Sequence, residues 1–280
     1  MNKIIDGKLI SSKIKEKIKE KIQNFDVKPT LVVIQVGNNE ASNVYVKNKK
    51  NAAINVGMNF NHIHFEETIN EQEIIKTIEK LNKDNTVNGI IVQLPLPHHL
   101  NSNKIINHIV PIKDVDGLTT INLGKLFNDE ECLTSCTPAG IIELLKAYNI
   151  KLEGKCVTIV GRSTLVGKPL IHMLLKENAT VVVCHSKTVD LKQFTTKADI
   201  LIVAAGKKHL ICSEMVKNGA IIIDVGINKI DNKLYGDVNF NDVLDKVSYI
   251  TPVPGGVGPM TIAILLNNTL KSYNMLNKKD

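Results

Sequence analysis

The chain has 280 residues, of which 43% are hydrophobic and 22% charged, as expected for an ordinary globular protein of one or two domains. Its formal net charge of +7 comes from dispersed lysines, and it has no tryptophan, so it lacks the basic and aromatic platform of a nucleic-acid binder. No apolar stretch could span a bilayer and no secretory segment opens the chain, so we expect a cytoplasmic protein without nucleic-acid or membrane partners.

The first half of the chain alternates strands and helices. An amphipathic helix is predicted first, because Ile10, Ile14, Ile18 and Ile22 recur at every fourth position between charged residues. Strands are then predicted at residues 30–36, 59–65 and 87–94, and helices at residues 40–56 and 70–83, the second capped by Asn70. Such alternation predicts a parallel sheet with helices on both faces.

A second alternation begins at Thr137-Pro138, where proline suits the first turn of a helix reaching Tyr148. Further elements are predicted as strands at residues 156–160, 179–184, 200–204 and 220–225, a helix from residue 166 and a last helix over residues 261–275. We therefore predict an α/β protein in which two α/β domains flank a cleft, the second being a Rossmann-type dinucleotide-binding domain. The first domain is expected to hold residues 1–136 and the returning helix 260–280, and the second residues 137–259.

The cysteine pattern indicates a reducing compartment. The count is odd and contains no C-x-x-C pair, and several cysteines lie in apolar runs. We expect reduced, mostly buried thiols. The five are Cys132, Cys136, Cys156, Cys184 and Cys212.

Arg162 is the only arginine among 35 basic residues, and it follows the strand predicted at 156–160. It belongs to the loop Gly161-Arg162-Ser163-Thr164-Leu165-Val166-Gly167, which departs from G-x-G-x-x-G but has a strand before it and a helix after it, as at a dinucleotide site. A guanidinium binds phosphate through two N–H groups, which an ammonium does poorly. The alternative to a phosphate-binding role is that the single arginine stands at this position by chance.

The next strand favours NADP over NAD as the cofactor. An NAD site usually has a carboxylate at the end of this strand, to hold the ribose hydroxyls. Here the strand ends in Cys184-His185-Ser186-Lys187, without a carboxylate that would repel a 2′-phosphate. Arg162 and Ser186 would receive that phosphate, with Lys187 as a further candidate.

Tyr45 and Lys49 share one face of a predicted helix, because they are four residues apart. The spacing suits an exposed amphipathic pair as well as a catalytic one. It also matches the Tyr-x-x-x-Lys of short-chain dehydrogenases, but there the glycine loop precedes the pair and here it follows. Proton transfer by Lys49 would require burial or a neighbour to lower its pKa from about 10.4 toward neutrality.

Three further features are candidates for binding. Gln93 closes a strand, where a neutral amide could position a lysine or ligand, or merely cap the strand end. Asp114 and Asp116 share a predicted turn, but two carboxylates make a poor metal site, so no metal is expected. We expect Asp114 at the surface and Asp116 accepting hydrogen bonds from a ligand. The glycine-rich loop 252–259 would let backbone approach a flat ligand, or would merely connect two elements.

These motifs together resemble one family, the bifunctional methylenetetrahydrofolate dehydrogenase/methenyltetrahydrofolate cyclohydrolases, over nearly the whole chain. Ser135 is a departure, since the family usually has proline before Cys-Thr-Pro, and we expect only a local backbone difference there, remote from the chemistry. The matching strings are Ile5-Asp6-Gly7-Lys8, Tyr45-x-x-x-Lys49, residues 92–97, residues 113–117, Cys136-Thr137-Pro138-x-Gly140, residues 161–169, residues 185–188, residues 224–228 and residues 252–261.

The resemblance implies oxidation of 5,10-methylenetetrahydrofolate with NADP, hydrolysis of the methenyl product to 10-formyltetrahydrofolate, and a homodimer in one-carbon metabolism and purine biosynthesis. It implies that Lys49 handles protons, Gln93 tunes it, Tyr45 shapes the pterin pocket and Asp116 binds the pterin N–H groups. The residues implied to hold NADP are Gly161, Arg162, Ser163, Ser186 and Ile227. Those implied to border the folate are Pro254, Gly255 and Gly256.

Two alternatives come from other classes of protein. One is a short-chain-dehydrogenase-like NADP carbonyl reductase that uses Tyr45 and Lys49 and ignores folates. The other is a non-catalytic dinucleotide-binding regulatory protein, which the presence of both Lys49 and Gln93 disfavours.

Overall fold

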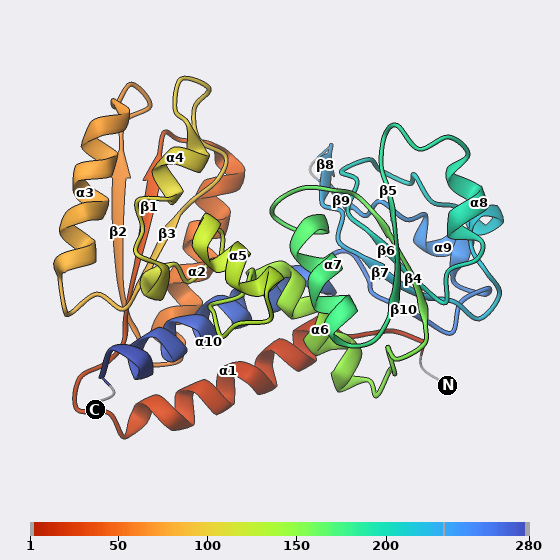
Figure 1. Ribbon diagram of the computed structural model, residues 1–280, viewed down its shortest axis with the longest axis horizontal. Coiled ribbons are helices and arrows are strands. Elements are labelled where there is room, and N and C mark those ends of the chain that lie inside the picture. Colours follow the sequence, from red (N-terminus) through yellow and green to blue (C-terminus); the bar gives the residue numbers. More distant parts are fainter. Residues whose placement is uncertain (1–2, 232, 278–280) are drawn as a thin grey trace. The chain divides into compact units, whose positions relative to one another are not determined.

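The chain divides into two compact units, each built around its own parallel sheet (Figure 1). A computed structural model describes residues 3–231 and 233–277. The Arg162 unit comprises residues 3–11 and 137–261, and the Lys49 unit comprises residues 12–136 and 262–277. This division differs from the expected one at the N-terminus. Residues 3–11 go with the Arg162 unit because Ile5 N donates to Ile250 O at 2.9 Å and Lys8 N donates to Gly255 O at 3.1 Å.

The Lys49 unit has a three-stranded parallel sheet in the order β2-β1-β3. Its central strand β1 is buried at every residue, whereas the edge strand β2 has none buried. Asn70 caps α3 as predicted, since its side chain accepts from Glu73 N at 3.0 Å. The elements are β1 (Thr30–Val36), α2 (Glu40–Asn55), β2 (Asn59–Phe65), α3 (Glu71–Lys83), β3 (Gly89–Val92), α4 (Ser102–Ile106), η1 (Pro111–Lys113) and α5 (Thr120–Phe127).

The Arg162 unit has a five-stranded parallel sheet in the order β10-β7-β6-β4-β5. The chain leaves β4 to form β5 on one side and then returns to form β6 on the other, which makes the carboxyl ends of β4 and β6 a topological switch point. The predicted α/β class is confirmed. The elements are α6 (Cys136–Ala147), β4 (Cys156–Val160), α7 (Gly167–Lys176), β5 (Thr180–Cys184), α8 (Leu191–Thr195), β6 (Ile200–Val203), η2 (Ser213–Met215), β7 (Ile221–Asp224), β8 (Asn228–Ile230), β9 (Lys233–Tyr235), α9 (Phe240–Val243) and β10 (Tyr249–Ile250).

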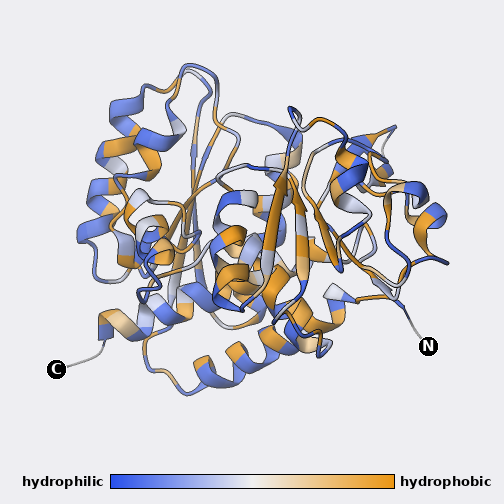
Figure 2. Cartoon of the chain, turned by 45° about the vertical axis from the view of Figure 1, so that its right-hand side comes forward, coloured by the Kyte–Doolittle hydropathy of each residue, from blue (hydrophilic) through white to orange (hydrophobic). Residues whose placement is uncertain are grey.

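Two long helices lie near the chain ends. The predicted amphipathic helix is α1 (Gly7–Gln23), which buries Ile18 and Ile22, and Figure 2 shows hydrophilic and hydrophobic residues alternating along it. The last helix, α10 (Val257–Asn277), begins four residues before the predicted Thr261. Its first turn therefore includes Gly258 and Pro259, residues that the sequence analysis placed in a loop.

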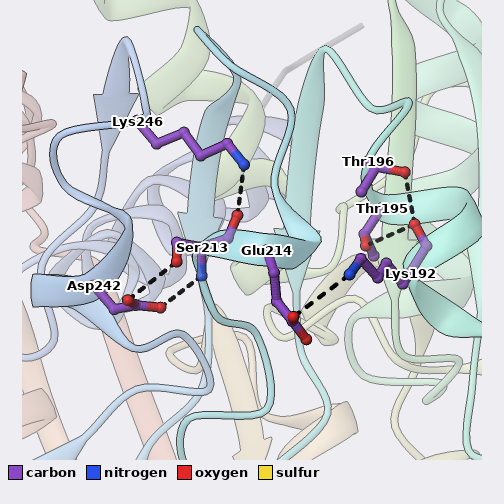
Figure 3. A network of polar contacts seen from close by, with 7 residues as sticks. All are labelled: Lys192, Thr195, Thr196, Ser213, Glu214, Asp242 and Lys246. Atoms are coloured by element: carbon purple, nitrogen blue, oxygen red, sulfur yellow. Dashed lines mark hydrogen bonds and ion pairs between the residues drawn. The ribbon is translucent and has the colours of Figure 1, made fainter.

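A polar network stabilises the surface of the Arg162 unit (Figure 3). The Asp242 carboxylate accepts from Ser213 N at 2.6 Å and from Ser213 Oγ at 3.1 Å, while Lys246 Nζ donates to Ser213 O at 2.8 Å. Lys192 and Glu214 form an ion pair at 3.5 Å, with both side chains half or more exposed. None of the predicted catalytic or binding residues belongs to this network. We therefore assign the network a structural role.

Residues 3–231 and 233–277 contain no helix long and apolar enough to cross a membrane. They also contain no group of three or more His, Cys, Asp or Glu side chains that could hold a metal ion. As expected, none of the five cysteines is paired in a disulfide, but only Cys136 and Cys184 are fully buried and the other three are half-buried.

Candidate functional site

Lys49 lies on the buried face of α2. The buried residues of that helix are Ser42, Val46, Lys49 and Ala53, which recur at the spacing of a face turned to the core. Lys49 is only 7% exposed, and its Nζ donates a 2.9 Å hydrogen bond to Gln93 Oε1. It is therefore not half of an exposed amphipathic pair.

Gln93 is held in one orientation at the carboxyl end of β3. Its backbone N–H donates to Ile34 O at 2.8 Å, which extends the sheet by one residue. Its side-chain Nε2 donates to Leu94 O at 2.7 Å, so the amide oxygen is the atom that faces Lys49. The structure thus brings Lys49 and Gln93 together, as the positioning interpretation of Gln93 predicted.

Asp116 and Cys136 complete a cluster of titratable groups around Lys49. Burial lowers the pKa of the Lys49 amine below its usual value, and the negative charge of Asp116 opposes that effect. Burial raises the pKa of Asp116, against the opposing charge of Lys49. The Cys136 thiol hydrogen-bonds Asp116, and burial raises the pKa of that thiol well above its usual range. Lys49 can therefore exchange protons nearer to neutral pH than a solvated lysine.

Tyr45 lies one helical turn before Lys49 and is half-buried. Burial raises the pKa of its phenol, so the hydroxyl stays protonated at neutral pH. It can therefore act as a neutral polar or stacking group, and not as a base.

The expectation that Asp114 is a surface residue is wrong. Asp114 is 1% exposed, and its carboxylate accepts from Gly117 N at 3.1 Å, Thr119 N at 2.8 Å and Asn122 Nδ2 at 2.9 Å. These bonds close the turn that carries Asp116 and anchor it to the start of α5. Asp114 is therefore a structural part of the site, and Asp116 is the acid of the pair that is left for a ligand.

The expectation that Ser135 is remote from the chemistry is also wrong. Ser135 is 1% exposed, and its hydroxyl donates to Gly117 O at 3.0 Å, directly beside Asp116. Gly117 has a φ of +67°, and a Cβ there would collide with the backbone of Thr134. Ser135 therefore adds a hydrogen bond to the turn of Asp116 that a proline could not donate.

The loop after β4 has the geometry of a tight phosphate-binding turn. Gly161 has a φ of +140°, and a Cβ there would collide with Ala204 O at the end of β6. A Cβ at Gly167 would collide with Gly161 O, so α7 starts directly against this turn. Ser163 shapes the loop, because its Oγ accepts from Val166 N at 3.1 Å. Both glycines of the predicted motif are thus required by the backbone.

Arg162 and Ser186 lie at the ends of two hydrogen-bonded strands. In the register of β4 with β5, Val160 pairs with Cys184, and each strand is followed two residues later by one of these side chains. Both side chains are exposed, and no carboxylate stands among residues 185–187. A guanidinium and a hydroxyl at neighbouring strand ends fit the 2′-phosphate of NADP better than the bare ribose of NAD.

Asp237, which the sequence analysis did not single out, connects the loops that follow β6 and β7. Its fully buried carboxylate accepts from the three consecutive N–H groups of residues 205–207, at 2.6 to 2.9 Å, and from Asn228 Nδ2 at 2.9 Å. Asn228 follows Ile227, a predicted cofactor residue that is 48% exposed. Asp237 therefore fixes the backbone of the loops that follow β6 and β7, on one side of the switch point.

Asp224 supports the same region from the end of β7. Its carboxylate accepts from the backbone N–H groups of Gly226, Asp237 and Val238 at 2.9 to 3.0 Å. Burial raises its pKa to about 6, although those three bonds favour the charged form. Asp224 thus holds the backbone of Gly226, which directly precedes Ile227.

The glycines of the loop 252–256 are explained by packing within the Arg162 unit. Gly255 has a φ of +112° and accepts from Lys8 N at 3.1 Å, while a Cβ on Gly256 would lie 2.7 Å from Pro252 O. Pro254 is exposed. Close approach of this loop to a flat ligand, and the role of Pro254, Gly255 and Gly256 at the folate, stay predictions.

Family models match both parts of the chain. Residues 5–116 match the catalytic domain of tetrahydrofolate dehydrogenase/cyclohydrolase, and residues 135–277 match the NAD(P)-binding domain of the same family. The chain belongs to the tetrahydrofolate dehydrogenase/cyclohydrolase family.

Individual members of the family match over nearly their whole length. The bifunctional protein FolD of Streptococcus uberis is 50% identical over 277 residues, which are 97% of this chain and 98% of the relative. The crystal structure of the bifunctional FolD methylenetetrahydrofolate dehydrogenase/cyclohydrolase from Campylobacter jejuni has 50% identity and a TM-score of 0.96, covering 97% and 98% of the two chains. The Trypanosoma brucei methylenetetrahydrofolate dehydrogenase-cyclohydrolase, complexed with NADP and an inhibitor, has 32% identity and a TM-score of 0.94, covering 99% and 98%.

These matches confirm the family that the motifs resembled, and within it an NAD(P)-binding domain over residues 135–277. They support neither a short-chain-dehydrogenase-like reductase nor a silent regulatory protein. The placement of Tyr45 and Lys49 also disfavours the short-chain-dehydrogenase alternative, because this pair and the glycine loop lie in different units.

Proposed function

We propose that the buried amine of Lys49 and the exposed guanidinium of Arg162 carry out the central tasks of a bifunctional folate enzyme. The enzyme oxidises 5,10-methylenetetrahydrofolate to 5,10-methenyltetrahydrofolate with NADP, and hydrolyses the methenyl compound to 10-formyltetrahydrofolate. The observation that carries the proposal is the 2.9 Å bond from Lys49 to Gln93, beside the Asp116 carboxylate, in a chain of this family.

In the hydrolytic step, neutral Lys49 accepts a proton from water while the water oxygen forms a bond to the methenyl carbon. The protonated amine then delivers that proton to the ring nitrogen N5 as the bond from this nitrogen to the carbon breaks, and the hydroxyl on that carbon releases its own proton to solvent, which leaves the formyl group on N10. One amine can do both only if its pKa lies near the working pH, and burial shifts Lys49 in that direction.

Gln93 and Asp116 have different tasks around that amine. Gln93 orients the amine with a neutral acceptor, which adds no negative charge to hold the proton on Lys49. Asp116 accepts hydrogen bonds from the N–H groups of the pterin, and Tyr45 shapes the pocket that receives the ring. The neutral phenol of Tyr45 and the ionisable Asp116 suit these roles.

The cofactor residues hold NADP at the switch point of the second sheet. When bound, NADP accepts a hydride from the methylene carbon. Arg162 and Ser186 bind the 2′-phosphate. The loop backbone at Gly161 and Ser163 faces the remaining phosphates. Ile227 offers an exposed apolar side chain to the nicotinamide end of the cofactor.

An absorbance assay tests the two activities together. Purified protein is mixed with methylenetetrahydrofolate and either NADP or NAD, and reduced nucleotide and methenyl product are followed separately. We expect reduced nucleotide with NADP, at least about tenfold less with NAD at equal concentration, and disappearance of added methenyltetrahydrofolate faster than in buffer. Equal rates with NAD would remove the 2′-phosphate role, and absence of both activities would reject the proposal.

We further propose a cytoplasmic homodimer that supplies formyl groups to purine biosynthesis. Buried thiols such as those of Cys136 and Cys184 suit a reducing compartment. The strand β5 is an edge of the larger sheet, and its residues 181–183 are valines that are only half-buried, so another copy could cover them. Light scattering should give twice the mass of one chain, and a monomer at micromolar concentration would reject the dimer.

A further inference from the structure

Asn268, on α10, is a fully buried side chain that joins two segments of the Lys49 unit. Its Nδ2 donates to Val115 O at 2.9 Å and to Thr134 O at 2.8 Å. Two carbonyl acceptors require an amide nitrogen between them, so the orientation of the side chain is fixed. Asn268 thus uses both of its N–H groups on backbone outside its own helix.

The amide oxygen of Asn268 is left without a hydrogen-bond partner among the described residues, although it is buried. An unpaired buried acceptor destabilises a fold, and an apolar side chain of similar size would avoid that loss. Asparagine at this position is therefore not explained by packing alone. The two donated bonds are what an apolar residue could not supply.

The two joined segments carry Asp116 and Cys136. Val115 immediately precedes Asp116, and two further bonds connect the segments: Ser135 Oγ to Gly117 O at 3.0 Å and Cys136 Sγ to Val115 O at 3.3 Å. Asn268 binds both segments at once, so it fixes their spacing from a third element. Of the two, Asp116 carries the negative charge that most opposes the effect of burial on the pKa of Lys49, while Cys136 is the thiol that hydrogen-bonds Asp116.

We infer that Asn268 is a positioning residue for the folate chemistry, holding the Asp116 and Cys136 segments in register so that the Asp116 carboxylate faces both Lys49 and the pterin. The inference rests on the proposed roles of Lys49 and Asp116. Asn268 acts on these groups through the backbone of both segments and through a 3.8 Å contact of its Nδ2 with Cys136 Sγ, so its role is to position them.

The test compares Asn268→Leu and Asn268→Asp with a matched control, Thr269→Val. Leucine removes both donors and keeps the branching and the number of heavy atoms, although it is larger, and aspartate keeps the shape but turns oxygens toward the two carbonyls. Thr269 is equally buried on the same helix, but its hydroxyl donates only within that helix, to Leu265 O at 2.9 Å. Each variant is checked by circular dichroism and by NADPH titration before kinetics.

Both Asn268 variants should lower kcat/KM for methylenetetrahydrofolate roughly 10- to 100-fold, as expected when a reacting group is displaced by about an ångström. The KM for NADP should not change. The acidic limb of the pH profile of methenyltetrahydrofolate hydrolysis should move to lower pH, because the Asp116 carboxylate no longer lies in place to keep Lys49 protonated. Thr269→Val should match the wild type in all three measurements.

Normal folate kinetics and an unmoved pH profile in a folded Asn268 variant would overturn the inference. Equal losses of kinetic efficiency with folate and with NADP would also overturn it. The same holds if both Asn268 variants and a third, Asn268→Ala, fail to fold, because either result describes a residue that only stabilises the core. Failure of the proposed function is distinguishable, because the wild type itself would then lack both activities or show no acidic limb.

Discussion

Lys49 Nζ donates a 2.9 Å hydrogen bond to Gln93 Oε1, and these two side chains are only 7% and 8% exposed. A buried ammonium usually requires an anionic partner, and a neutral amide provides a hydrogen bond without that charge. Gln93 therefore orients Lys49 while leaving burial free to lower its pKa. Three of the predictions below depend on this pairing.

Gln93→Glu should move the acidic limb of the hydrolysis profile to higher pH. A carboxylate 2.9 Å from the amine would favour the protonated form and raise the pKa of Lys49, so less neutral amine would be present at pH 7. We expect a displacement of about one pH unit or more, measured as kcat for methenyltetrahydrofolate hydrolysis from pH 5 to 10. A limb at the wild-type position would show that Lys49 does not titrate in this step.

Asp116→Asn should move the same limb in the opposite direction. The Asp116 carboxylate opposes the effect of burial on Lys49, so its removal lowers the pKa of Lys49 further and keeps the amine neutral at lower pH. The rate must be measured at saturating folate, because the variant also loses an acceptor for the pterin. If Gln93→Glu and Asp116→Asn moved the acidic limb of the pH profile in the same direction, the electrostatic explanation of the Lys49 pKa would be refuted.

Arg162→Ala should raise the KM for NADP by about 10- to 100-fold, the range expected for lost hydrogen bonds to a charged phosphate. Folate KM should not change. Arg162→Lys keeps the charge but not the two-pronged geometry, so its KM for NADP should fall between those of the wild type and the alanine variant. Initial rates with NADP varied at saturating folate give the comparison, and an unchanged KM in the alanine variant would count against the phosphate role.

Gly161→Ala should destabilise the Arg162 unit and weaken NADP binding, because φ is +140° and the new Cβ would meet Ala204 O. We expect a loss of roughly 1–3 kcal/mol in the free energy of unfolding. Gly258→Ala is the matched control, since a Cβ there has no neighbour within 4 Å and its φ is not positive. Urea denaturation and NADPH titration of both variants decide the matter, and equal behaviour would show that the turn tolerates a side chain.

Regular elements with strong periodicity could be predicted from the sequence. The strand at residues 156–160 has the predicted bounds, and the Asn70 cap is confirmed. The hairpin of β8 with β9 and the two-residue strand β10 were missed, since three residues or fewer show no periodicity. Pro259 was taken for a loop residue although it lies in the first turn of α10, where its missing N–H costs nothing.

The buried polar contacts could not be predicted because they depend on tertiary neighbours. Asp114 looks like a surface residue in sequence, and only its three donors within residues 117–122 make it structural. Ser135 and Asn268 come from segments 133 residues apart in the chain, yet both hydrogen-bond the backbone that flanks Asp116. Pairing of Lys49 with Gln93 was suggested only by the position of Gln93 at a strand end.

The most direct test of the central claim is the rate of methenyltetrahydrofolate hydrolysis by Lys49→Ala, with Lys50→Ala as the exposed neighbouring control and NADPH titration of the same preparations. We predict a loss of at least about 100-fold in hydrolysis for Lys49→Ala, the contribution expected of a general acid–base group, with nucleotide affinity unchanged and Lys50→Ala like the wild type. Near-normal hydrolysis by a folded, NADPH-binding Lys49→Ala enzyme would contradict the role of Lys49 as the proton carrier.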